Sequence, residues 1–281
     1  MRDNILMVVS GKKRIGKSNE TLKKMIYQAY LSPHRRKVLY FDVNGEYGSY
    51  KIDGKEAHSI KKIGEHEIIN YANATNVFEV RRIVPEITND MLNNVDELED
   101  YVDNLLITIL VQFRNGILVL EDLNNVLGDV LPKRFTAMIC NNPHRNCDII
   151  IHFQSVGRLS PKLLQNTEYI RFHYQLDDLD DVKYKLRGDY EILKIAQNLV
   201  NNEFMIGNKR FHILLNREEK KISGKFSPLM LSNAIQKYLQ QNPRKMKSIL
   251  NEKNIKGKRV YNYESAMKTK TKELFEMYWG N

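Results

Sequence analysis

The sequence has few cysteines and no long apolar run. Its 281 residues include only two cysteines, Cys140 and Cys147, which excludes a disulfide framework or a four-cysteine zinc site and favours a reducing compartment. The longest apolar runs, at 105–110 and 116–120, are far shorter than the roughly 18 residues that a membrane span requires. The first residues do not have the pattern of a signal peptide. We therefore expect a soluble, cytoplasmic protein.

Acidic residues are outnumbered by basic ones. The chain has 44 Lys and Arg against 34 Asp and Glu, a formal net charge of +10, and a pI of about 9.3. This excess favours an anionic partner such as nucleic acid, nucleotide or an acidic surface. The alternative is a chain that is simply rich in lysine and asparagine. The length suffices for one large α/β domain or two small ones with a buried core.

Short apolar segments alternate with segments of helical periodicity, which predicts a doubly wound, mainly parallel α/β sheet with helices on both faces. Strands are predicted at 5–9, 37–42, 77–85, 117–121, 148–154 and 168–174, and a hairpin at 210–226. Helices are predicted at 17–30, 93–115, around 130–140, and at 182–200 and 228–240. Pro243 is interpreted as the end of a compact domain, 1–243, followed by a basic tail or arm, 244–281.

The segment GKKRIGKS at 11–18 matches the phosphate-binding pattern G-x-x-x-x-G-K-[ST], between a predicted strand and a predicted helix. Gly11 and Gly16 would let successive N–H groups face the β-phosphate. Lys17 would reach the β- and γ-phosphates, and the Ser18 hydroxyl would bind Mg²⁺. The alternative is a basic surface turn. The predicted nucleotide-binding residues here are Gly11, Lys12, Lys13, Arg14, Ile15, Gly16, Lys17, Ser18 and Asn19.

Polar residues follow two further strands. Glu121 and Asp122 follow the apolar run 117–120, where a carboxylate pair would hold the metal and polarise water. The usual order is Asp then Glu; by position, Glu121 is assigned to the metal and Asp122 to the base, and the inversion leaves both assignments open. Gln154 ends the strand 148–154 and would sense the γ-phosphate or orient the water. The alternative for Glu121 and Asp122 is an acidic helix cap, and the alternative for Gln154 is a polar strand terminus.

Four segments together resemble the HerA–FtsK group of P-loop ATPases, which includes DNA pumps and viral packaging relatives. They are SGKKRIGKS (10–18), VLYFDVNGEYG (38–48), ILVLED (117–122) and HRNCDIIIHFQS (144–155). The segment at 159–173 is also similar to the group, and the zonula-occludens-toxin-like phage assembly ATPases share much of the pattern. The resemblance covers about 4–175, which leaves 176–243 as a helix–hairpin–helix elaboration.

The resemblance implies a RecA-like P-loop NTPase fold and a ring, commonly a hexamer. Asp42 and Glu46 would line the nucleotide site or its subunit boundary. Arg145, or His144 beside it, would reach a neighbour's γ-phosphate as an arginine finger, and Arg158 is a second candidate. Two features depart from the group: the acidic pair is inverted, and the long membrane segment of the toxin-like and cell-division branches is missing, which argues against a membrane-anchored motor.

The expected function is an ATP-hydrolysing DNA translocase that uses ATP and Mg²⁺ and packages a viral or mobile-element genome. Such a protein would lie in the host cytoplasm or in the virion. The catalytic residues would be Glu121, Asp122, Gln154 and Arg145, and the partner would be double-stranded DNA, bound independently of sequence. The alternative is a nucleotide-gated assembly protein with little sustained turnover. A kinase would need an arginine-rich lid, which is not evident in the sequence. A GTPase would need an Asn-Lys-x-Asp motif after the loop, and the sequence has none, so both classes are disfavoured.

The predicted tail contains ten Lys and Arg, four Asp and Glu, and several aromatic residues. Basic residues interleaved with aromatics suit nucleic-acid stacking. They also suit a docking peptide, in which 273–279 forms a short amphipathic helix on a capsid or portal-type protein. The third alternative is a solvated terminus.

Overall fold

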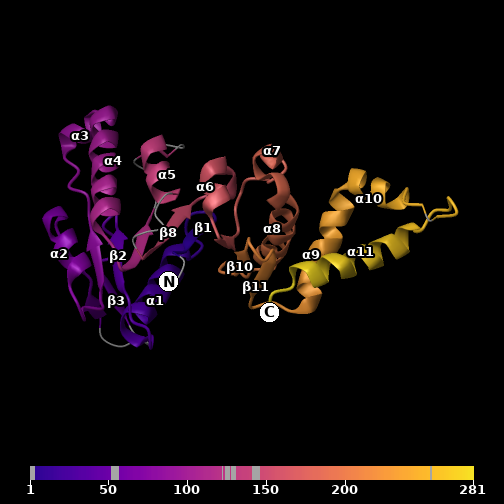
Figure 1. The fold of residues 1–281 in the computed structure, drawn as a ribbon, viewed down its shortest axis with the longest axis horizontal. Coiled ribbons are helices and arrows are strands. Elements are labelled where there is room, and N and C mark those ends of the chain that lie inside the picture. Colours follow the sequence, from indigo (N-terminus) through magenta and orange to yellow (C-terminus); the bar gives the residue numbers. More distant parts are fainter. Residues whose placement is uncertain are drawn as a thin grey trace. The chain divides into compact units, whose positions relative to one another are not determined.

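The computed structural model describes residues 4–51, 57–121, 123, 127, 131–140, 146–253 and 255–281, and Figure 1 shows its ribbon. The chain forms two compact units, which are described separately. Unit 1 comprises Met1–Val9 and Gly16–Glu168, and unit 2 comprises Ser10–Ile15 and Tyr169–Asn281. The division expected after residue 243 is not a boundary between these units.

The main sheet of unit 1 has six strands. They lie in the order β1-β8-β7-β2-β6-β5, and the pairs β5–β6, β6–β2, β2–β7 and β7–β8 are parallel. A separate antiparallel hairpin joins β3 (Ser49–Lys51) and β4 (Ala57–Ser59). The bounds of the main strands are β1 (Leu6–Ser10), β2 (Lys37–Phe41), β5 (Lys61–Lys62), β6 (Val80–Ile83), β7 (Gly116–Leu120) and β8 (Cys147–Phe153).

Helices cover the sheet of unit 1. Met25 and Ala29 pack against Val38, Tyr40 and Val119 in one apolar cluster, so the first helix and its continuation lie on this face. All residues of β2 and β7 are buried, and because alternate residues point to opposite faces, the other face is covered too. The helices are α1 (Lys17–Ile26), continued by a π-turn at Tyr27–Leu31, then α2 (Ile68–Asn73), α3 (Asn89–Asn93), α4 (Val95–Gln112), α5 (Lys133–Cys140) and α6 (Pro161–Asn166).

Unit 2 contains an antiparallel sheet and a group of helices. The strand order is β9-β10-β11, in which β10 and β11 form the hairpin predicted from the sequence. The strands are β9 (Tyr169–His173), β10 (His212–Asn216) and β11 (Lys221–Gly224), and the helices are α7 (Lys183–Leu186), α8 (Tyr190–Met205), α9 (Pro228–Gln241), α10 (Pro243–Leu250) and α11 (Tyr263–Tyr278).

With the six-stranded sheet and the hairpin of unit 1, the three strands of unit 2 and the helices around them, the described chain is a mixed, mostly parallel α/β protein. The predicted fold class is confirmed. In the described ranges, no helix is both long enough and apolar enough to span a membrane.

The basic segment 244–281, expected as a tail or arm, contains two ordered helices. α10 begins at Pro243, because the fixed φ of proline and its missing N–H suit the first turn of a helix. α11 buries Ala266, Leu274 and Tyr278, which recur at helical spacing among the lysines and define an apolar face. The end of α11 is joined to β11, where the Asn281 side chain bonds the backbone of Gly224 in both directions at 2.8 Å.

One carboxylate of α8 connects the helices of unit 2. Glu191 accepts hydrogen bonds from the hydroxyl of Tyr238 on α9 at 3.0 Å and of Tyr278 on α11 at 2.7 Å. It also forms an ion pair with Lys245 on α10. Burial raises the pKa of Tyr238 and of Tyr278 to about 12, so both phenols remain protonated donors well above neutral pH.

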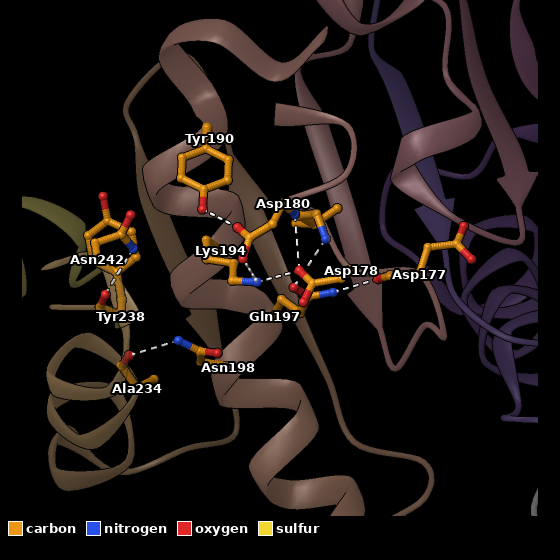
Figure 2. A network of polar contacts seen from close by, with 11 residues as sticks. Asp177, Asp178, Asp180, Tyr190, Lys194, Gln197, Asn198, Ala234, Tyr238 and Asn242 are labelled. Atoms are coloured by element: carbon orange, nitrogen blue, oxygen red, sulfur yellow. Dashed lines mark hydrogen bonds and ion pairs between the residues drawn. The ribbon is translucent and has the colours of Figure 1, made fainter. Parts of the chain in front are cut away.

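A second polar network holds the segment after β9 against α8 (Figure 2). Lys194 is only 4% exposed, and its ammonium pairs with the carboxylates of Asp178 and Asp180. Gln197 donates to the carbonyl of Asp177 at 2.8 Å, and the Tyr190 hydroxyl donates to Asp180. Because a buried ammonium needs such partners, this segment is held in one position.

We expect Glu191→Ala to lower the free energy of unfolding by about 2–3 kcal/mol, because it leaves three donors on three helices without their acceptor. Urea denaturation followed by circular dichroism measures this change. Glu273→Ala is the matched control: Glu273 is half exposed and pairs with Lys270 on the same helix, so a change below about 1 kcal/mol is expected. Equal effects of the two substitutions would contradict the role assigned to Glu191.

Candidate functional site: a P-loop and a buried carboxylate

The loop between β1 and α1 has the backbone of an anion-binding turn. Gly11, Arg14 and Gly16 have positive φ values of 155°, 65° and 89°, which turn successive N–H groups toward one side. Gly16 precedes α1 as its N-cap and, having no side chain, offers no side-chain cap to the helix. The first-turn N–H groups of α1 are therefore suited to an external anion such as a phosphate.

The loop is supported by the chain just beyond β9. The Lys12 N–H donates to the Tyr174 carbonyl at 2.7 Å, and the Ser10 hydroxyl donates to Oε1 of Gln175 at 3.2 Å. A Cβ atom on Gly11 would lie 2.6 Å from Cβ of His173. Only glycine fits there, because real Cβ atoms do not approach so closely and the φ value is also unfavourable for other residues.

The predicted nucleotide-binding residues differ in their exposure. Lys17 begins α1 and is 7% exposed, while Ile15 is buried in the interior. Ser18 is half-buried beside Lys17 in the first turn. The remaining side chains of the loop are exposed, namely Lys12, Lys13, Arg14 and Asn19. The lysine and the serine to which the sequence assigns phosphates and metal are thus the polar side chains turned away from bulk solvent.

Three polar side chains meet at the carboxyl ends of the strands. Phe41 of β2 is paired with Leu120 of β7, and Leu120 with Ile151 of β8. The next residues of these parallel strands, Asp42, Glu121 and His152, therefore lie level with one another. They are 1%, 5% and 1% exposed, respectively. This edge is where open α/β sheets bind ligands.

Glu121 has a partner on each carboxylate oxygen. The Tyr47 hydroxyl donates to Oε2, and Nδ1 of His152 lies 3.2 Å from Oε1. The side chain of Ser18 lies near this phenol. Burial, and then the negative charge of Glu121, raise the pKa of Tyr47 well above its usual range, so the phenol stays protonated and can only donate to the carboxylate.

His152 connects Glu121 to α1. Its Nε2 lies 2.9 Å from the hydroxyl oxygen of Thr21, and the Thr21 hydroxyl donates to the carbonyl of Lys17 at 3.0 Å. The direction of the hydrogen bond between Thr21 and Nε2 depends on which ring nitrogen of His152 carries the proton.

Asp42 organises the turn that carries Tyr47. Its carboxylate accepts from the N–H groups of Glu46 at 3.0 Å and of Tyr47 at 3.1 Å. It also pairs with Arg82 at 3.0 Å, which in turn bonds the Gly45 carbonyl at 3.3 Å. Asp42, expected to line the nucleotide site, is thus bonded to its own turn, and the side chain of Glu46 is exposed.

The other predicted catalytic residues are placed only in part. Gln154 follows β8 directly and is half-buried, while Arg158 is exposed in a 3₁₀ turn at Val156–Arg158. Asp122, His144 and Arg145 lie outside the described residues. The roles assigned to them as base and arginine finger stay predictions.

Sequence reasoning missed Tyr47, His152, Thr21 and Arg82. For two of them, the sequence contained a feature that could have indicated a functional role. Tyr47 belongs to the motif at 42–48, and His152 is a polar residue near the carboxyl end of an otherwise apolar strand. Thr21 lies four residues after Lys17, one helical turn along the same face. Arg82 lies in β6, and only the sheet register brings it to Asp42.

These residues fit a magnesium–nucleotide complex. The loop offers N–H groups and an ammonium for phosphates. The Ser18 hydroxyl and the Glu121 carboxylate are oxygen donors of the type that Mg²⁺ prefers. The Tyr47 phenol bonds Glu121 and lies near Ser18. The beginning of α1 and the carboxylate therefore belong to one site.

Comparisons with known proteins support the fold. No family model matches the chain, and no curated protein matches its sequence. The structure of the genome packaging NTPase B204 from Sulfolobus turreted icosahedral virus 2, in complex with ATP-gammaS, is 13% identical with a TM-score of 0.50, over 79% of this chain and 97% of that one. The chain thus shares the fold of this packaging NTPase.

Two further structures are more distant. The DNA-packaging ATPase B204 from Sulfolobus Turreted Icosahedral Virus is 15% identical with a TM-score of 0.47, over 79% of this chain and 97% of that one. The N-terminal domain of zonular occludens toxin from Neisseria meningitidis is 11% identical with a TM-score of 0.30, over 65% and 91%.

We expect Gly11→Ala to destabilise the protein by about 1–3 kcal/mol, because the added methyl group clashes with His173 and the backbone is strained. Nucleotide binding should weaken with it. Gly188→Ala is the matched control, since a Cβ atom at Gly188 meets nothing within 4 Å. Thermal unfolding of both variants measures the difference, and an unchanged melting temperature for Gly11→Ala would contradict the close approach to His173.

Proposed function

We propose that this chain is a magnesium-dependent ATPase that moves double-stranded DNA, in the manner of a motor that packages a viral or mobile-element genome. One observation carries the proposal: Glu121 at the end of β7 contacts His152, which in turn contacts Thr21 of α1, the helix that follows the phosphate-binding loop. A phosphate-binding loop next to a buried carboxylate is the arrangement that nucleotide hydrolysis requires. The fold shared with a packaging NTPase supports the same conclusion.

In this proposal, Lys17 and the loop N–H groups hold the phosphates, while Ser18 and Glu121 hold Mg²⁺. The metal, when bound, neutralises charge that develops on the phosphates. Asp122 takes the proton of the attacking water, and Gln154 orients that water. Arg145 of a neighbouring copy in a ring would complete the site.

Basic residues of α10, α11 and the segment between them are the proposed DNA-binding residues. They are supported by their exposure and by the excess charge of 244–281, with ten Lys and Arg against four Asp and Glu. The exposed ones are Arg244, Lys247, Lys253, Lys256, Lys258, Arg259, Lys268 and Lys272. Such residues bind phosphates without reading sequence, as a translocase must.

We expect ATP hydrolysis that double-stranded DNA stimulates and that Lys17→Ala reduces by at least about a hundredfold, since an ammonium on the transferred phosphate stabilises the transition state. Lys23→Ala is the matched control, because Lys23 is an exposed lysine of the same helix. Steady-state phosphate release with and without DNA measures the effect.

The same assay separates the proposal from its main alternative. Nucleotide binding without turnover, unchanged by DNA, would contradict a motor and favour a nucleotide-gated assembly protein that docks on a capsid or secretion complex. ATP hydrolysis that DNA does not stimulate would show that the chain is an ATPase, but one that does not move DNA.

We expect the triple substitution Lys256→Gln, Lys258→Gln and Arg259→Gln to weaken DNA binding equally for unrelated sequences. The slope of log K against log salt should become shallower by about 1 for each DNA phosphate that the variant no longer neutralises. Fluorescence anisotropy over a range of salt concentrations measures both the affinity and the slope. An unchanged slope would exclude this segment from the DNA-binding surface.

A further inference from the structure

Glu121 is held from two sides by side chains that both return to the beginning of α1. On one side, Tyr47 donates to Oε2 and lies near Ser18. On the other side, His152 lies 3.2 Å from Oε1 and leads through Thr21 to the Lys17 carbonyl. We call this closed series of interactions the Glu121 circuit; its members are Ser18, Tyr47, Glu121, His152, Thr21 and the backbone of Lys17.

The circuit has two branches. Since Tyr47 donates to Glu121, its oxygen can accept from the hydroxyl of Ser18. Thr21 contacts both Nε2 of His152 and the carbonyl of Lys17, so the second branch also returns to the helix. Each branch therefore runs from the carboxylate of Glu121 to the first turns of α1. Tyr47 forms one branch, and His152 with Thr21 forms the other.

Two partners on two different oxygens fix more than the position of Glu121. A glutamate side chain has three rotatable bonds, and one partner would still allow its carboxylate plane to turn. A partner at Oε2 and a contact at Oε1 restrict the rotation of that plane as well. The strand order makes this possible, because β8, which carries His152, lies between β1 and β7.

The turn that carries Tyr47 is itself fixed. Asp42 accepts from the Tyr47 N–H at 3.1 Å and from Arg82 at 3.0 Å. The Tyr47 ring also packs on the ring of Tyr40, with centroids 5.1 Å apart. The hydroxyl of Tyr47 therefore reaches Glu121 from a rigid support, as positioning residues in an active site do.

We infer that Tyr47 and His152 are positioning residues of the nucleotide site, which hold the Glu121 carboxylate against α1 so that Glu121 and Ser18 take up Mg²⁺ together. Tyr47 acts through Ser18 and Glu121, and His152 acts through Glu121 and Thr21. The inference rests on the proposed function. It predicts that Tyr47 and His152 contribute to nucleotide affinity only when Mg²⁺ is bound.

The first test compares nucleotide affinity with Mg²⁺ and with EDTA, using anisotropy of a fluorescent ATP analogue. Tyr47→Phe keeps the ring that packs on Tyr40 and removes only the hydroxyl. We expect it to reduce the gain in affinity that Mg²⁺ provides by about tenfold, as the removal of one hydrogen bond to a charged group would. The affinity in EDTA should stay within about twofold of the native value.

Tyr30→Phe is the matched control for that test. The Tyr30 hydroxyl accepts from the Val80 N–H at 3.1 Å and lies in the same apolar cluster, but it has no part in the Glu121 circuit. Its removal should leave the gain from Mg²⁺ unchanged. A decrease of similar size in both variants would show that general loosening of the core is responsible, and would overturn the assignment of Tyr47.

The second test separates the two nitrogens of His152. His152→Asn places an amide N–H near the position of Nδ1 and can keep the interaction with Glu121. His152→Gln places one near the position of Nε2 and can keep only the interaction with Thr21. We expect the asparagine variant to retain most of the gain from Mg²⁺ and of kcat, and the glutamine variant to lose about tenfold of each.

Thermal unfolding of the variants accompanies these measurements, so that binding is compared only between folded proteins. Equal decreases for asparagine and glutamine would indicate a packing role for His152 and overturn its assignment. If the native chain binds nucleotide with a gain from Mg²⁺ that Tyr47→Phe and His152→Gln both retain, the inference is wrong while the proposed function stands. If the native chain binds no nucleotide, the proposed function fails, and the inference fails with it.

Discussion

A buried carboxylate constrains the whole site. Glu121 is 5% exposed at the end of a central strand, where an unpaired charge would cost several kcal/mol. Folding therefore has to bring donors to it from elsewhere in the chain. One comes from the turn after β2 and another from the interior of β8. Asp42, Arg82 and Thr21 form hydrogen bonds that keep those two donors in place.

The parallel sheet satisfies this constraint through its strand order and register. Because β8 stands between β1 and β7, a side chain at its carboxyl end can contact the strand that carries the acid and also the helix that follows β1. His152 does both, with Glu121 on one side and Thr21 on the other. The same few residues at one edge of the sheet thus provide partners for the buried charge of Glu121 and contact the helix that follows the phosphate-binding loop.

The elements that the sequence predicts well are those with a simple period. The apolar runs of β1, β2, β7 and β8 agree with the structure to within one residue at each end, because buried parallel strands are continuously apolar. The phosphate-binding loop is equally easy to predict from the sequence, since only glycines permit the φ values of Gly11 and Gly16. The segment 244–281 is harder to interpret. Its lysines and Pro243 suggest a tail, while the apolar face of Ala266, Leu274 and Tyr278 favours a packed helix.

The partners of Glu121 could not be predicted in the same way. They join residues 74 and 31 positions away along the chain, and neither pairing follows from a local period. Tyr47 lies in a turn whose shape depends on Asp42 and on Arg82 from a different strand. His152 is level with Glu121 only because of the register between β7 and β8. The sequence shows the residue types, whereas the pairing depends on how strands distant along the chain align.

The aromatic residues at the end of α11 have a practical consequence. Trp279 is the single tryptophan of the chain. It stacks on Phe275 with centroids 5.1 Å apart and meets Phe226 edge-on at 5.5 Å. Since indole emission shifts in wavelength and intensity when its surroundings change, selective excitation of the indole in the unlabelled protein reports on one place, the junction of α11 with the hairpin. The chain thus carries its own optical probe for any event that loosens its basic helices.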